Sequence, residues 1–104
     1  MATTIRPEVS TRNPFWINKH RYYELKHFCL QYPSLTGENK DNVKKLISNI
    51  AYKAEPELAE YIVDAVTKGH SFTYLKCVLE MPCEKDMYYN RYRKFFWLLD
   101  KEKK

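Results

Sequence analysis

Glycine is nearly absent from this sequence, since Gly37 and Gly69 are the only two among 104 residues. Sheet proteins rely on glycine in their tight turns, where the backbone must adopt left-handed angles. A sandwich or a barrel contains many such turns, so two glycines argue against both architectures. The scarcity of glycine therefore predicts an all-α fold, a small helical domain of about five helices.

The length leaves room for one domain, because domains commonly hold about 100–150 residues. Apolar residues form 44% of the chain and aromatic residues 15%, which is enough for a compact core. Residues 1–13 are mostly polar and predict a flexible tail, followed by a single helical domain over residues 14–104. No apolar run approaches the roughly 18–20 residues that cross a bilayer, so no membrane partner is expected.

Hydrophobic spacing and helix-breaking residues divide the domain into five predicted helices. Their expected ranges are 19–32, 39–53, 56–68, 72–80 and 84–101. Asn18 and Ser71 are expected to cap the first and fourth helices, because their side chains accept hydrogen bonds from free backbone N–H groups. Gly69 is expected to end the third helix in the left-handed conformation.

Three cysteines occur in a chain whose first residues show no secretory signal, which predicts free thiols in a reducing cytoplasm. Cys83 lies near the start of a predicted helix, where the helix dipole lowers the pKa of a thiol. We therefore expect Cys83 to react more readily than Cys77. The spacing of His20, His27 and Cys29 does not place all three on one helix face, so no metal site is expected.

Catalytic motifs are missing from the sequence. No glycine-rich phosphate loop is present, so no cofactor is expected. Ser71 beside His70 could be interpreted as a nucleophile and its base, but a helix cap is the favoured interpretation of that serine. The sequence therefore predicts that the protein is not an enzyme.

Positive charge is concentrated at the C-terminal end of the chain. Eighteen Lys and Arg residues oppose thirteen Asp and Glu residues, for a formal net charge of +5. Seven basic and three acidic side chains lie within residues 85–104, whereas residues 55–64 carry four acidic side chains and no basic one. A basic segment of this kind favours an anionic partner such as nucleic acid.

Residues 58–100 have the layout of a helix-turn-helix, with a short Ser-capped helix, a turn of three to four residues and a longer helix. Leu75, Val78 and Leu79 are expected to pack the short helix onto its neighbours. The core side of the longer helix is expected to hold Tyr88, Tyr92, Phe95 and Leu99. Its outer side would read the major groove of double-stranded DNA. The residues expected to bind DNA are Lys85, Tyr89, Asn90, Arg93 and Lys94.

Those residue types suit the two parts of a DNA interface. Arginine can form two hydrogen bonds to a guanine edge, and asparagine can do the same at adenine. Lysine and the tyrosine hydroxyl commonly contact phosphates. The pattern therefore favours a DNA-binding protein.

The same stretch resembles the helix-turn-helix of sigma-factor region-four domains and of phage late-transcription regulators of the RinA/ArpU type. Two segments resemble parts of small phage and prophage proteins of Gram-positive bacteria. Their sequences are NPFWINKHRYYELKHFCLQYP and PCEKDMYYNRYRKFFWLLDK. Glu80 and Pro82 depart from the usual turn, and residues 34–57 form a shorter middle segment than in those proteins. The resemblance implies a phage-type transcription regulator in the cytoplasm of a bacterial host.

Aromatic residues support a second hypothesis, because so small a core cannot bury all of them. Trp16, Tyr23 and Trp97 are the residues expected to remain on the surface as a partner interface. Tyr, Trp and Arg dominate the binding energy of many protein interfaces. The alternative is a phage-encoded inhibitor of a host enzyme or defence complex, similar to anti-CRISPR proteins, that binds a host nucleic-acid-binding protein complex. A homodimer interface would use the same surface.

Overall fold

The computed structural model describes residues 15–103, which form helices and no strand. The α-helices are α1 (Lys19–Leu30), α2 (Gly37–Ala54), α3 (Ala59–Lys68), α4 (Phe72–Cys77) and α5 (Lys85–Glu102). Two short 3-10 helices, η2 (Tyr32–Ser34) and η3 (Pro56–Leu58), precede α2 and α3. The expected all-α fold with five α-helices is confirmed. No helix in the described part of the chain is long and apolar enough to cross a membrane. The expected tail over residues 1–13 lies outside the described residues.

The helix ends follow local sequence chemistry. The Asn18 side chain accepts a hydrogen bond from the His20 N–H at 2.8 Å, and the Ser71 hydroxyl accepts one from the Tyr74 N–H at 3.1 Å. Gly69 ends α3 with φ of 75°, an angle that residues with a Cβ rarely adopt. These three predictions are confirmed.

Proline shapes the connections that lead into α2 and α3. Pro33 and Pro56 both lie in the first turn of a 3-10 helix, where the missing N–H has no bond to lose. The first predicted helix is therefore shorter than expected, and the third begins as a 3-10 turn. α2 begins two residues earlier than predicted because the Thr36 carbonyl already accepts the Lys40 N–H at 3.4 Å.

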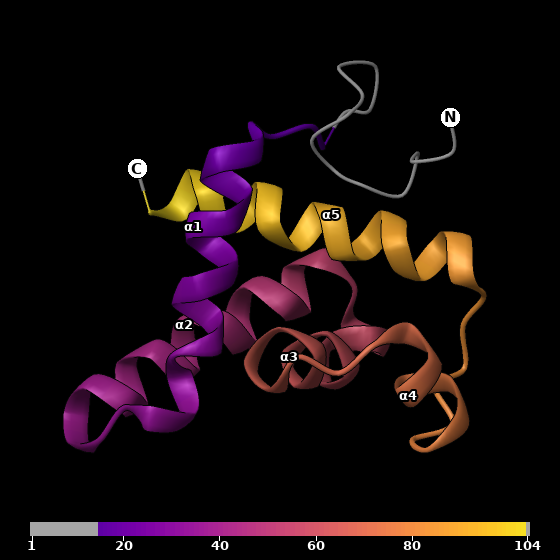
Figure 1. Ribbon diagram of the computed structural model, residues 1–104, viewed down its shortest axis with the longest axis horizontal. Coiled ribbons are helices and arrows are strands. Elements are labelled where there is room, and N and C mark those ends of the chain that lie inside the picture. Colours follow the sequence, from indigo (N-terminus) through magenta and orange to yellow (C-terminus); the bar gives the residue numbers. More distant parts are fainter. Residues whose placement is uncertain (1–14, 104) are drawn as a thin grey trace.

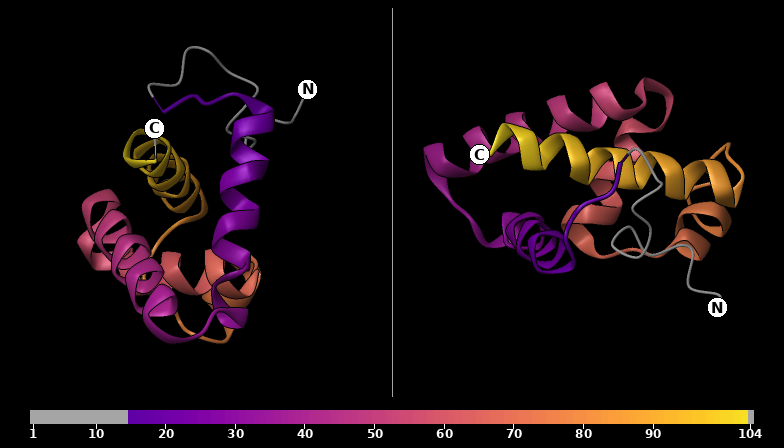
Figure 2. Two further views of the ribbon diagram at one scale, coloured as in Figure 1. Left: turned by 90° about the vertical axis from the view of Figure 1, so that its left-hand side faces the viewer. Right: turned by 90° about the horizontal axis from the view of Figure 1, so that it is seen from above.

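α5 lies along α2 and runs in the opposite direction, and α1 crosses α5 (Figures 1 and 2). This arrangement covers α5 on two sides, so both Phe95 and Phe96 are fully buried. Tyr88 and Leu99 are buried as expected, whereas Tyr92 is only partly buried. The largest side chains buried around them are Leu25, Ile47, Ile50, Ile62 and Leu75.

The end of α4 differs from the prediction. α4 stops at Cys77, and Val78 and Leu79, expected to be buried, are 57% and 38% exposed. Glu80 then adopts a positive φ of 55°, which reverses the chain. The reversal brings Met81 into the core with 1% of its surface exposed. Met81 is therefore the core residue that follows Leu75, in place of the predicted Val78 and Leu79.

The connection between α4 and α5 comprises residues 78–84. Lys76 of α4 stabilises this connection, because its ammonium group donates a hydrogen bond to the Cys83 carbonyl at 3.0 Å. A helix-turn-helix joins its helices by a turn of about three to four residues. The connection has seven residues, so the predicted turn of three to four residues is wrong. The helix-turn-helix as a whole is not confirmed and stays a prediction.

Candidate nucleic-acid interface

The outer face of α5 is the side that points away from α1, α2 and α3. Helical spacing places Asn90, Arg93, Lys94, Trp97 and Lys101 on this face, opposite the buried residues of the same helix. Lys101 is exposed and the other four are partly exposed. The outer face of α5 therefore combines three cations, one amide and one large aromatic ring.

Two lysines of α5 and Lys103, which directly follows the helix, lie over aromatic rings. The ammonium nitrogens are 5.8 Å from the Phe15 ring centre for Lys94, 4.3 Å from Trp97 for Lys101 and 4.0 Å from Phe28 for Lys103. Among residues 15–103, none of these ammonium groups lies within salt-bridge distance of a carboxylate. An aromatic ring attracts an ammonium group only weakly. The N–H groups of the ammonium can therefore still donate hydrogen bonds to an anion.

Two ion pairs neutralise acidic groups that contact α5. The Arg91 guanidinium donates to Glu55 at 2.9 Å, and Arg21 of α1 donates to Asp100 at 2.5 Å. The hydrogen bond to Asp100 raises the pKa of the Arg21 guanidinium. These pairs join α5 to α1 and to the end of α2. Because each carboxylate is paired with an arginine, it repels an approaching phosphate less than an unpaired carboxylate would.

The structure separates the five residues predicted to bind DNA. Asn90, Arg93 and Lys94 share the outer face, and Lys85 is exposed at the first turn of α5. The Asn90 amide oxygen accepts a hydrogen bond from Arg91 at 2.5 Å.

Tyr89 does not share the outer face. Its ring centre is 6.1 Å from that of Phe72 and 6.4 Å from that of Tyr92, in a groove between α1 and another side of α5. Lys85 precedes Tyr89 by four residues, so helical spacing places it nearer to Tyr89 than to the outer face. Only Asn90, Arg93 and Lys94 of the predicted residues therefore share one surface.

The three residues predicted for a partner interface also divide into two places. Trp16 is 37% exposed and Tyr23 is 41% exposed. Trp97 is partly buried. The Phe15 ring packs edge-on against it with ring centres 5.4 Å apart, and Lys101 lies over its face. The contact with Phe15 brings Trp16 to the neighbourhood of Trp97, whereas Tyr23 lies on α1 beside the groove.

Sequence reasoning missed Lys101 and Lys103 as site residues. Trp97 and Lys101 are four residues apart on a predicted helix, and this spacing could have indicated that Lys101 contacts the Trp97 ring. The contact between Lys103 and Phe28 joins the two ends of the domain, and no local spacing indicates it.

The Ser71 hydroxyl serves as the cap of α4, as favoured from the sequence. The neighbouring His70 ring is hydrogen-bonded through Nδ1 to Asp64 and stacks on Tyr74, with ring centres 3.8 Å apart. Within residues 15–103, no three His, Cys, Asp or Glu side chains converge as metal ligands would.

The expected order of cysteine reactivity is wrong. Cys83 is buried, and burial raises the pKa of its thiol despite the nearby helix start. Cys77 is exposed, and burial raises the pKa of Cys29 to about 12. Alkylation of the native protein should therefore modify Cys77 first and Cys29 last, because the thiolate is the reacting form. Peptide mass spectrometry over a time course measures the order, and prior modification of Cys83 would contradict it.

Comparison with known proteins gave no match to a protein-family model, to a curated protein or to a solved structure. The resemblance to RinA/ArpU-type regulators and sigma-factor region-four domains thus stays a prediction.

Proposed function

We propose that the protein binds double-stranded DNA through the outer face of α5, as a phage-type transcription regulator does. The observation that supports it is that Lys94 and Lys101 on this face lie over aromatic rings, and neither has a carboxylate partner among residues 15–103. Lysines in this state are suited to phosphate oxygens. Asn90 and Arg93 on the same helix supply the groups that read base edges.

The dimensions of α5 suit this task. A helix of 18 residues is about 27 Å long, and the major groove is about 12 Å wide, enough to admit a helix. Contact with a ring restricts the side-chain freedom of each lysine before DNA arrives, so less entropy is lost on binding. The proposal therefore requires no rearrangement of the described core.

Binding to DNA should weaken steeply as salt is added. Each lysine or arginine that neutralises a phosphate releases condensed counterions, so the logarithm of affinity falls by about 0.9 per contact for each logarithmic unit of salt. Phosphate contacts by Arg93, Lys94 and Lys101 predict a slope of about −3 or steeper. Fluorescence anisotropy of a labelled duplex at several salt concentrations measures the slope. An affinity that is constant between low and moderate salt would contradict the proposal.

A protein partner is the second candidate, and one observation favours it. Val78, Leu79 and Met87 are exposed apolar side chains at the α4–α5 connection and the first turn of α5. Exposed apolar residues that cluster often mark a protein interface. Affinity capture from a bacterial host lysate, with and without nuclease, separates the candidates. A stoichiometric protein that persists after nuclease treatment would favour the inhibitor, and loss of all captured material would favour DNA.

A further inference from the structure

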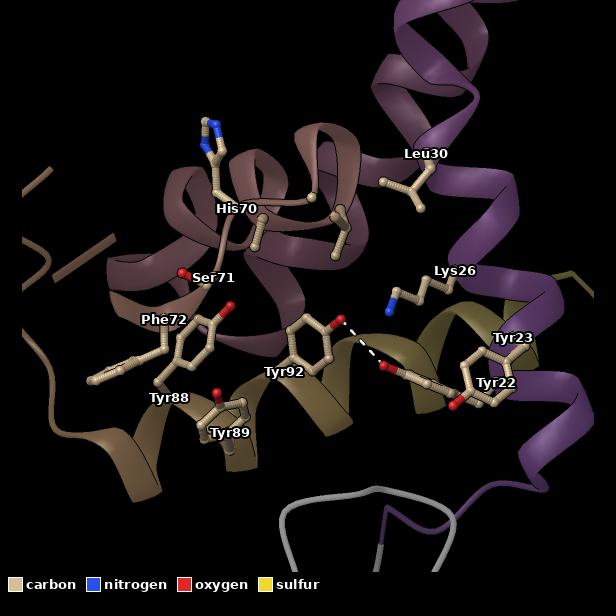
Figure 3. Close-up of a pocket in the computed structure, with 13 residues that line it drawn as sticks. Tyr22, Tyr23, Lys26, Leu30, His70, Ser71, Phe72, Tyr88, Tyr89 and Tyr92 are labelled. Carbon is tan, nitrogen blue, oxygen red and sulfur yellow. Dashed lines mark hydrogen bonds between the residues drawn. The ribbon is translucent and has the colours of Figure 1, made fainter. Parts of the chain in front are cut away.

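An open groove of about 390 Å³ lies between α1, the segment after α3 and the inner flank of α5 (Figure 3). Its volume is within the range of about 300–1,000 Å³ common for small-molecule sites. The polar and aromatic groups that define it are Tyr22, Tyr23, Lys26, Tyr88, Tyr89 and Tyr92. Because the lysines of the proposed DNA site lie elsewhere on α5, the groove does not depend on that proposal.

The walls of the groove are mainly tyrosine rings. Tyr88, Tyr89 and Tyr92 pack against one another with ring centres 5.2–6.4 Å apart, and Phe72 extends the series at 5.6 Å from Tyr88. Tyr22 and Tyr23 of α1 line the opposite wall, with ring centres 5.1 Å apart. The rings are tilted relative to one another by 38–79°. Such a lining favours an aromatic ligand, which can contact the rings by their edges or faces.

The polar groups named above are tyrosine hydroxyls, which can donate or accept hydrogen bonds, and one ammonium group, which only donates. The Tyr22 and Tyr92 hydroxyls share a hydrogen bond of 3.4 Å, and Lys26 extends its ammonium group from α1 (Figure 3). Among residues 15–103, no carboxylate lies within salt-bridge distance of Lys26. The His70 ring points away from the tyrosine hydroxyls and is bonded to Asp64. The groove therefore favours a ligand with acceptors and a negative charge.

Tyr88 gives independent evidence of a ligand. Its side chain is 2% exposed, yet its hydroxyl has no hydrogen-bond partner within residues 15–103. The hydroxyl points toward the groove (Figure 3). Burial raises the pKa of Tyr88, so the group stays a protonated donor. A buried donor without a partner costs free energy, and an acceptor on a ligand would remove that cost.

We propose that the groove binds a nucleotide, with the base packed against the tyrosine rings that line it. The Tyr88 hydroxyl donates to an acceptor on the base edge, and the Lys26 ammonium group binds the phosphate. The two donors come from α5 and α1, which are opposite walls of the groove, so a ligand must carry an acceptor and an anion at separate ends. A nucleotide meets this requirement either as a free mononucleotide or as a unit of a single strand.

Isothermal titration with the four ribonucleoside monophosphates tests the proposal in the full chain. We expect saturable binding of at least one of them, and weaker binding of the matching nucleoside, which lacks the phosphate. A tetranucleotide single strand forms the second arm. Much tighter binding of the tetranucleotide assigns the site to single-stranded nucleic acid, and equal binding assigns it to the free nucleotide. If no mononucleotide and no tetranucleotide binds below about 1 mM, the proposal is wrong.

Two variants locate the binding. Tyr88→Phe removes one oxygen and keeps the ring, and we expect affinity to fall about tenfold to a hundredfold. Lys26→Gln should weaken binding of the monophosphate while leaving the nucleoside unchanged. Lys53→Gln, at an exposed lysine in the last turn of α2, is the matched control and should bind like the wild type.

The thermal stability of Tyr88→Phe gives a readout that a purely structural role would not produce. Because the hydroxyl has no partner in the described residues, the variant should melt at the wild-type temperature or higher. An unchanged or raised melting temperature together with weaker nucleotide binding supports the site. A variant that binds as tightly as the wild type overturns the role of Tyr88.

Discussion

Replacing Phe95 with alanine is expected to lower the free energy of unfolding by about 3–5 kcal/mol. Phe95 has no exposed surface, and its ring meets the Phe96 ring at a centre distance of 5.0 Å. Alanine would leave a cavity between α5 and the helices that pack on it, and the removed carbons would lose their burial. Domains have about 5–15 kcal/mol of stability in total, so the variant should be largely unfolded on modest heating.

Tyr52→Ala is the matched control for Phe95→Ala. Tyr52 is also an aromatic residue within a helix, but it is 63% exposed. Surface substitutions usually change stability by no more than about 0.5 kcal/mol. Urea unfolding followed by circular dichroism gives both values. Equal losses in the two variants would contradict the packing of α5 described above.

Alkaline pH is expected to destabilise the protein sharply. Burial raises the pKa of Cys29 from an ordinary value of 9.0 to about 12, and burial also raises the pKa values of Tyr88 and Tyr92 above 10.0. Each group therefore holds its proton in the folded state at a pH where the unfolded chain has lost it. The stability is fully present below the unfolded pKa values and falls as pH rises above them.

The expected loss is about 1.4 kcal/mol per pH unit for each such group between its two pKa values. The losses of the three groups add, so stability should fall more steeply above pH 10, where the tyrosines contribute, than between pH 9 and 10. Tyr88→Phe should reduce the pH dependence above pH 10, whereas Tyr52→Phe should not change it. Urea unfolding at a series of pH values between 8 and 11 makes the measurement. A flat stability profile over that range would show that these groups ionise as easily in the folded state as in the unfolded one.

The features that sequence predicted best depend on a few neighbouring residues. Asn18 and Ser71 cap helices through bonds that span two or three residues, and Gly69 ends α3 through its own backbone angles. The core positions of α3, such as Ile62, follow from helical spacing alone. Such local rules need no knowledge of the tertiary structure.

The features that sequence missed depend on distant segments. Val78 fits the helical spacing of α4, but the reversal at Glu80 places Met81 in the core instead. Tyr89 was predicted on the DNA surface from its spacing, yet it lies in a groove whose other wall is α1. The contact of Lys103 with Phe28 likewise requires α1 to cross the end of α5. None of these outcomes follows from the spacing of residues along a single helix.

Binding of duplex DNA by two triple variants gives the most direct test of the outer face of α5. One variant replaces Arg93, Lys94 and Lys101 of α5 with glutamine, and the control replaces Lys40, Lys44 and Lys45 of α2 with glutamine, so both lose three positive charges. Thermal melting first establishes that both variants fold, and anisotropy of a labelled duplex then gives affinity against salt. We expect the α2 variant to bind like the wild type, and the α5 variant to lose about three units of salt slope and at least a hundredfold in affinity. Equal binding by the two variants would show that α5 is not the DNA-binding surface.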